Sequence, residues 1–157
     1  MIVPASEADG SDIQRITATA GNFSDEEIEC VKELWDEYVN EGPEISGYHF
    51  IVHKEEGQVY GYACYGPRAL THGSYDLYWI ASDIQTRRHG AGRALMAHVE
   101  QEIAAKGGRL VIVETSGMEA YIGTRKFYAS IGYTPEAVIK DFYSDGDDLV
   151  IYTKKLK

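Results

Sequence analysis

Residues 74–106 read SYDLYWIASDIQTRRHGAGRALMAHVEQEIAAK, and this stretch decides the fold. Its first part, 74–82, is an apolar and aromatic run typical of a strand. Its last part, 92–106, repeats Leu95, Val99 and Ile103 at the spacing of one helix face. The arginine- and glycine-rich loop between them leaves main-chain N–H groups unpaired at the helix start, where the helix dipole adds positive potential. This pattern predicts a seat for phosphate groups.

The rest of the chain predicts mixed α and β structure around one twisted sheet. Further helices are expected at 9–20, 24–40 and 122–131, and strands at 2–5, 48–54, 58–65, 109–115, 137–142 and 149–155. Ser24 and Glu27 have the spacing of a capping box at a helix start. The strand at 109–115 is apolar enough to be buried on both faces, and a strand–helix–strand order with this spacing implies a parallel crossover from 75–82.

Composition narrows the class of protein. A length of 157 residues predicts a single domain spanning 1–157, and no stretch approaches the ~20 apolar residues of a membrane span. The N-terminus lacks the basic and apolar regions of a secretion signal, so we expect no membrane association. Cys30 and Cys64 lie far apart and predict buried or half-buried thiols in a reducing compartment, the cytoplasm.

The formal net charge of −10 argues against nucleic-acid binding and favours a cationic small molecule or a basic peptide as partner. Against this background Arg87, Arg88, His89 and Arg93 form a local positive cluster, which predicts a specific anion.

Two motifs carry a resemblance to a known family. Arg87-x-x-Gly90-x-Gly92 after an apolar strand is similar to the acyl-CoA pyrophosphate loop of the GCN5-related N-acetyltransferase (GNAT) superfamily. Residues 127–133, FYASIGY, resemble that superfamily's aromatic-Tyr-x-x-x-Gly-aromatic segment, and the order of elements matches over 1–157. The connection 116–124 is longer than the usual link. The tail, 139–152, is similar in outline to ribosomal-protein alanine acetyltransferases.

The resemblance implies an α+β (mixed α/β) GNAT acyl-CoA N-acyltransferase fold. Its central twisted sheet would be mostly antiparallel, with a parallel pair formed by 75–82 and 109–115, and helices would flank it. It also implies acetyl-CoA as cosubstrate. The residues then expected to bind it are Ile80, Ala81, Ser82, Arg87, Arg88, His89, Gly90, Ala91, Gly92, Arg93 and Tyr128. Among these, the main-chain N–H groups of 88–93 would hold the pyrophosphate, and an N–H near 80–82 would face the developing oxyanion.

Acyl transfer to an amine also needs an acid and a base. By the resemblance, Tyr128 reaches the CoA sulfur, and its phenol is the expected acid for the leaving thiolate. An alkyl amine has a pKa of about 10, so its proton must be taken up by a carboxylate or by water. Asp76 has an offset from Gly90 similar to that of the catalytic glutamate in histone-type members of the superfamily, and Glu114 ends an apolar strand where burial would raise its pKa.

Both carboxylates also have an alternative interpretation in which they are not catalytic. Asp76 could be a solvent-facing acid at the strand end, and Glu114 could form an ion pair with Arg109 or Arg125. If neither carboxylate is the base, water alone takes the proton.

The acceptor pocket is expected to involve Tyr78, on the strand face of Asp76 and Ile80, together with Trp35 and Tyr38. The five histidines show no metal-ligand spacing, so no metal is expected.

The sequence therefore predicts an acetyl-CoA-dependent N-acetyltransferase acting on a primary amine of a small molecule, a peptide or protein N-terminus, or a lysine, by direct attack on the thioester. The alternative is a non-catalytic acyl-CoA-binding sensor. A Rossmann-type nucleotide binder fits less well, because Gly90-x-Gly92 lies in the middle of the chain and Met96 follows where a third glycine is expected. A homodimer is compatible with the sequence.

Overall fold

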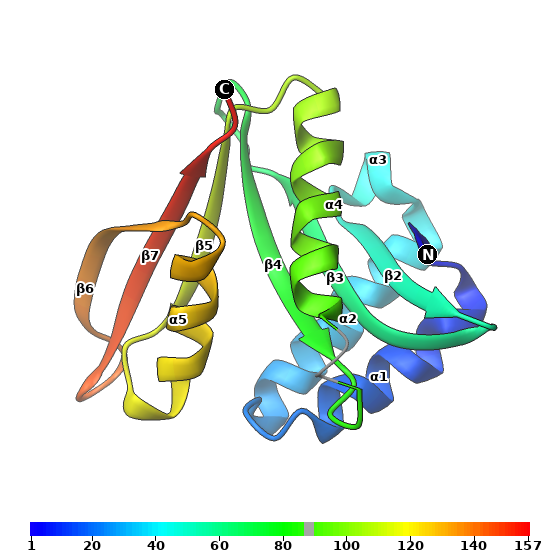
Figure 1. The fold of residues 1–157 in the computed structure, drawn as a ribbon, viewed down its shortest axis with the longest axis horizontal. Coiled ribbons are helices and arrows are strands. Elements are labelled where there is room, and N and C mark those ends of the chain that lie inside the picture. Colours follow the sequence, from blue (N-terminus) through cyan, green and yellow to red (C-terminus); the bar gives the residue numbers. More distant parts are fainter. Residues whose placement is uncertain (87–89) are drawn as a thin grey trace.

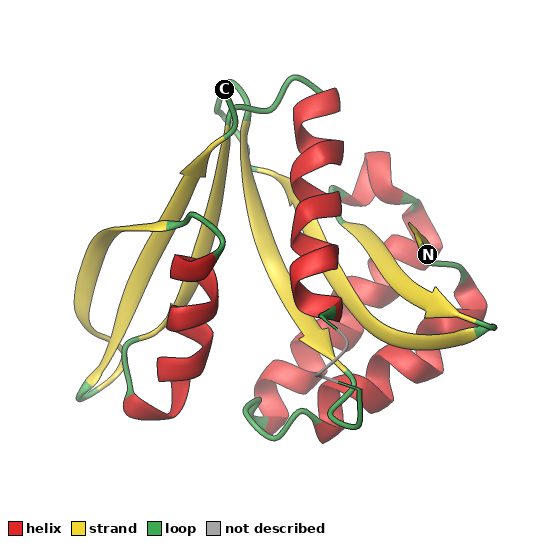
Figure 2. Cartoon of the chain, in the orientation of Figure 1, coloured by secondary structure: helices red, strands yellow, loops and turns green. Residues whose placement is uncertain are grey.

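The computed structural model describes residues 1–86 and 90–157, which fold around one seven-stranded sheet (Figure 1 and Figure 2). The strands are β1 (Ile2–Pro4), β2 (His49–Glu55), β3 (Gln58–Pro67), β4 (Ser74–Ser82), β5 (Leu110–Ser116), β6 (Thr134–Ser144) and β7 (Asp147–Lys155). They lie in the order β1-β2-β3-β4-β5-β7-β6. β4 and β5 run parallel, and the other neighbouring strands pair antiparallel. The predicted sheet with its parallel pair is confirmed.

Helices cover the two faces of this sheet unequally. They are α1 (Gly10–Thr19), α2 (Asp25–Glu41), α3 (Pro43–Ser46), α4 (Ala91–Ala105) and α5 (Ile122–Ser130), with short 3-10 helices η1 (Glu7–Asp9) and η3 (Glu119–Tyr121). α4 and α5 pack on one face, whereas α1 and α2 pack on the other face over the N-terminal strands (Figure 1). The outer face of β5 and β7 is therefore left without a covering helix.

The local sequence explains these helices. The Ser24 hydroxyl accepts from the Glu27 N–H at 3.1 Å, and Glu27 Oε1 accepts from the Ser24 N–H at 3.0 Å, so the predicted capping box starts α2. Leu95, Val99 and Ile103 are fully buried, as the helical spacing predicted for α4. None of the helices in residues 1–86 and 90–157 combines the length and hydropathy that a bilayer crossing requires.

Three local expectations differ from the structure. β5 is buried on one face only: Val111 and Val113 are buried, whereas Glu114 is exposed, because the helices that cover this part of the sheet lie on a single side. Cys30 is exposed rather than buried or half-buried. Helix α3 follows Gly42 where the sequence predicted only a break, and Pro43 fits there because the first helical turn does not need its missing N–H.

Candidate active site

Strands β4 and β5 separate halfway along their length (Figure 1). Their parallel pairing joins 74–77 with 110–113 and extends no further. In the same region the register of β4 against β3 shifts between Leu77 and Trp79, which makes Tyr78 the extra residue of a β-bulge. A bulge bends its strand and ends regular pairing. The main chain of 78–82 is consequently open on its β5 side.

A cleft of about 490 Å³ lies between this open end of β4 and helix α5. The α1–α2 connection and the first turn of α4 complete its walls. Of the residues predicted to bind the cosubstrate, Ile80, Ala81, Ser82, Gly92 and Tyr128 line it. These five come from three different elements, so the fold brings together residues that the sequence could only assign one by one.

The start of α4 has the predicted features of an anion seat. Gly90 precedes the helix in the left-handed conformation, with φ 69° and ψ 23°, which glycine adopts at little cost. The first helical bond runs from the Ala94 N–H to the Gly90 carbonyl, and no described residue accepts from the N–H groups of 91–93. The Arg93 guanidinium lies 3.4 Å from Ser130 Oγ. The predicted residues Arg87, Arg88 and His89 lie outside the described part of the chain.

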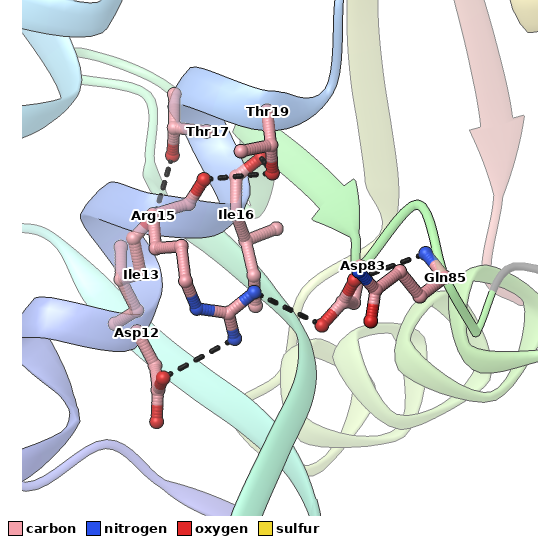
Figure 3. A network of polar contacts seen from close by, with 8 residues as sticks. All are labelled: Asp12, Ile13, Arg15, Ile16, Thr17, Thr19, Asp83 and Gln85. Carbon is pink, nitrogen blue, oxygen red and sulfur yellow. Dashed lines mark hydrogen bonds and ion pairs between the residues drawn. The ribbon is translucent and has the colours of Figure 1, made fainter.

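Asp83 fixes the segment that leads from β4 toward this seat (Figure 3). Its carboxylate is buried, and it accepts from Arg15 Nη1 of α1 at 3.1 Å and from the Gln85 N–H at 3.0 Å. Hydrogen bonding to Asp83 also raises the pKa of Arg15. The sequence did not point to either residue, although an aspartate directly after a strand is a typical first residue of such a turn.

A second cleft, of about 1040 Å³, adjoins the first and shares Asn22, Phe23, Ile80, Thr124 and Tyr128 with it. It lies beside the uncovered face of β5. The start of α2, the end of β3, the middle of β4 and the β6–β7 hairpin form its other walls. A bond of 2.7 Å from the Tyr121 hydroxyl to the Asn22 carbonyl joins the α1–α2 connection to η3 at the border of both clefts.

Tyr128 stands where the two clefts meet. It is 4% exposed, and the rings of Phe127, Tyr133 and Tyr152 surround its own at centroid distances of 5.4, 5.8 and 6.2 Å. Burial raises the pKa of its phenol, so the hydroxyl keeps its proton at neutral pH. No described residue forms a hydrogen bond with that hydroxyl, which leaves the proton available to a group that enters either cleft.

Both predicted carboxylates reach the larger cleft and share one arginine. Arg68 binds Asp76 with two contacts, Nε–Oδ2 at 2.9 Å and Nη2–Oδ1 at 3.0 Å, and its Nη2 lies 3.7 Å from Glu114 Oε2. Burial raises the pKa of Asp76, and the charge and hydrogen bonds of Arg68 partly oppose that shift. Arg68 is a site residue that the sequence did not reveal.

The alternative partners proposed for Glu114 are engaged elsewhere. Arg109 Nε donates to the His72 carbonyl at 2.6 Å, and Arg125 Nη1 donates to the Ser116 carbonyl at 2.8 Å. The Glu114 side chain is 44% exposed, so it lacks the burial that made it a candidate base. Asp76, by contrast, is 8% exposed rather than solvent-facing.

The three aromatic residues predicted for the acceptor pocket do not lie together in the structure. Tyr78 lines the larger cleft, but the bulge breaks the face it was expected to share with Ile80, which packs against the cluster under α4. The structure places Trp35 and Tyr38 in the core instead. Trp35 lies with its ring edge-on to Phe50 at 5.1 Å, and the Tyr38 hydroxyl donates to the Ala5 carbonyl. Trp35 and Tyr38 do not reach the cleft because they lie in the later turns of α2, and only the first turns of this helix line it.

Among the described residues no group of three or more His, Cys, Asp or Glu side chains could hold a metal ion.

Comparison with known proteins agrees with this geometry. The family profile described as "Acetyltransferase (GNAT) domain" matches residues 46–135. A solved GNAT-family protein from Desulfovibrio desulfuricans is 40% identical, with 100% of this chain and 99% of that chain covered and a TM-score of 0.96. A search of curated protein sequences found no match.

Two more distant solved structures share the fold. The ribosomal-protein-S18-alanine N-acetyltransferase from Escherichia coli is 18% identical, with coverage of 100% of this chain and 94% of that chain and a TM-score of 0.79. A Salmonella typhimurium protein solved with its cofactor acetyl-CoA is 20% identical, with the same coverages and a TM-score of 0.76. The chain that forms these two clefts beside a splayed parallel strand pair is thus an acetyltransferase of the class that the family profile and the 40% identical structure define. The chain is a member of the GNAT family.

Proposed function

We propose that this protein transfers the acetyl group of acetyl-CoA to a primary amine by direct attack of the amine on the thioester. The observation that carries the proposal is the meeting of the two clefts at Ile80 and Tyr128. One cleft extends toward the α4 amides, and the other contains the carboxylates that an amine needs.

The residues present fit acetyl-CoA. The N–H groups of 91–93 suit the diphosphate, and Gly92 has no side chain to keep a ligand away from the main chain. The main chain of 80–82 pairs with β3 but is open on its β5 side, which suits the amide-bearing arm of the cosubstrate, and an N–H there would serve the carbonyl oxygen that gains charge. Acetyl-CoA, when bound, supplies the acetyl group as a reactive thioester.

Side chains of the protein would accept and donate the protons of the reaction. Asp76 accepts the proton of the incoming ammonium, directly or through water, and its raised pKa suits this role. Glu114 is the second candidate base, since it faces the same cleft. Tyr128 donates its phenolic proton to the departing thiolate. Arg68 holds both carboxylates in place.

We also propose a reducing compartment, the cytoplasm, as the location. Both cysteines of the chain are unpaired, and Cys30 is exposed.

The proposal is tested in two steps. Acetyl-CoA should raise the melting temperature, whereas NAD and ATP should not. Release of the CoA thiol should then depend on an added primary amine. Stabilisation by acetyl-CoA without turnover of any amine in a broad panel would point to a binding sensor, and absence of stabilisation would refute both readings.

A further inference from the structure

The two clefts join at one level of the fold. Along β4, residues 76–79 line only the larger cleft, residues 81–82 line only the smaller one, and Ile80 lines both. The α1–α2 connection and helix α5 pass from one cleft to the other at the same level. The described residues that border both clefts form what we call the neck, and they are Asn22, Phe23, Ile80, Thr124 and Tyr128.

The neck is where the acyl group would lie if the proposed function holds. A thioester in the smaller cleft and an amine in the larger cleft can react only where the clefts join, because the nitrogen must come within roughly 3–3.5 Å of the carbonyl carbon. The alkyl part of the acyl group is attached to that carbon and has to fit into the same space. An alkyl group prefers the apolar walls of the neck, to which Phe23 and Ile80 contribute.

The Phe23 ring is held in place although it belongs to a connection between two helices. It stands edge-on to the Trp79 ring, with 5.3 Å between the ring centroids, and packs against the core under α1 and α2. The carbonyl of the preceding Asn22 accepts from the Tyr121 hydroxyl at 2.7 Å, and the capping box fixes Ser24 directly after it. A ring that is held in these three ways resists displacement by a larger acyl group.

Phe23 can also be changed without altering the other parts of the neck. Ile80 packs against the core under α4, and Tyr128 is 4% exposed and is the proposed acid, so changes at either residue would have several effects. Phe23 is half-buried and lies outside every helix and strand. Its side chain is therefore the part of the neck whose size can be tested by itself.

We propose that the Phe23 ring limits the transferred group to acetyl. The methyl group of acetyl packs against the ring, and the additional methylene groups of propionyl and butyryl collide with it. The inference rests on the proposed function and adds to it the residue that selects the acyl chain. The size of the acceptor cleft does not enter this selection, because a productive amine occupies that cleft.

The test compares acetyl-CoA, propionyl-CoA and butyryl-CoA with the primary amine that the panel identifies as the best acceptor. In the unaltered protein kcat/KM should fall about tenfold or more from acetyl to propionyl, which is the usual effect of one methylene group in a closed apolar site, and it should fall further for butyryl. Phe23→Ala should bring the acetyl-to-propionyl ratio close to one. Phe23→Leu keeps an apolar side chain on the core and should give an intermediate ratio.

Phe142→Ala is the matched control. Phe142 also stands edge-on to one aromatic ring, that of Tyr143 at 5.0 Å, but it lines neither cleft. The same loss of a phenyl group there should leave the acetyl-to-propionyl ratio unchanged.

The other outcomes refute the inference and can be told apart from failure of the proposed function. Equal kcat/KM for the three cosubstrates in the unaltered protein, or an acetyl-to-propionyl ratio that survives Phe23→Ala, overturns the role of Phe23 and leaves the proposed function intact. The same holds if Phe23→Ala lowers kcat/KM by one common factor, since the ring would then only order the neck. If Phe23→Ala does not fold, the ratio in Phe23→Leu decides. Absence of turnover of acetyl-CoA with every amine refutes the proposed function itself, and the inference falls with it.

Discussion

Tyr128 and Tyr133 provide a sharp test of the proposed acid, because they lie five positions apart, both are buried, and their hydroxyls have opposite surroundings. The Tyr128 hydroxyl has no described hydrogen-bond partner and its residue lines both clefts. The Tyr133 hydroxyl donates to Glu100 Oε2 at 2.9 Å within the core. Tyr128→Phe and Tyr133→Phe each remove one oxygen atom, so their effects on stability and rate can be compared directly.

The two changes should have opposite consequences. Loss of a hydrogen bond to a charged acceptor costs about 1.5–3 kcal/mol. Lys154 still binds Glu100 at 2.9 Å in Tyr133→Phe, so we expect the lower value and a fall in melting temperature of about 3–6 °C. Tyr128→Phe breaks no described bond, and its melting temperature should change by less than about 2 °C. Loss of a general acid should lower its kcat about a hundredfold.

The assay is thiol release under saturating acetyl-CoA and amine, together with a thermal melt of each variant without ligand. The expected pattern is a stable, slow Tyr128→Phe and a less stable, active Tyr133→Phe. A Tyr128→Phe variant with normal kcat would show that the thiolate takes its proton from water. An equal loss of kcat in both variants would show that packing of this aromatic group, and not the phenolic proton, limits the rate.

Three further outcomes follow from the structure. Gly92→Ala should raise the free energy of unfolding by up to about 1 kcal/mol, and the melting temperature with it, because alanine favours the helix and its methyl group meets Phe127 at an ordinary contact distance. The same methyl group should weaken acetyl-CoA binding in a titration by crowding the α4 amides. Asp83→Asn removes the charge that holds Arg15, so the KM for acetyl-CoA should rise more than kcat falls; an unchanged KM would show that the turn is held by its other bonds. Burial lowers the folded-state pKa of His49, so the stability linked to this group is present above its ordinary pKa and is lost as pH falls through the folded value. The melting temperature should therefore fall as the pH drops below the ordinary histidine pKa of about 6.5, and His49→Gln should make that fall smaller.

The sequence predicted those parts of the site that one continuous segment builds. The strand–loop–helix unit at 74–106 was predicted with β4 and the start of α4 in place, because hydrophobic spacing and glycine position are local signals. The bulge at Tyr78 that accompanies the opening of β4 was not predicted, since it depends on pairing with β3. The parallel neighbour β5 followed from the crossover rule. Contacts between separate segments were not predictable in this way. The Arg15–Asp83 pair joins residues 68 positions apart, and only the packing of α1 against β3 and β4 brings them together.

Trp35 and Tyr38 show how two signals from the same residues can compete. Their helical spacing with Val31 places them on the face of α2 that packs against the sheet, whereas their aromatic character made them candidates for the acceptor pocket. The spacing prevailed, because a helix packed along its whole length buries every residue of its inner face. Periodicity should therefore take precedence over residue type when both describe the same helix.

The distribution of helices explains why the proposed cofactor seat and the proposed acceptor site respond differently to substitution. The seat for acetyl-CoA is built on α4 and β4, whose inner residues form the core, so its geometry is fixed by the same packing that stabilises the fold. The acceptor cleft lies on the face of β5 without a helix, and Tyr143 and Asp147 belong to a hairpin whose β6 strand is exposed along its length and pairs only with β7. We therefore expect substitutions in this hairpin to alter acceptor preference more than cofactor binding, because the hairpin lines the proposed acceptor cleft and does not line the smaller cleft beside α4.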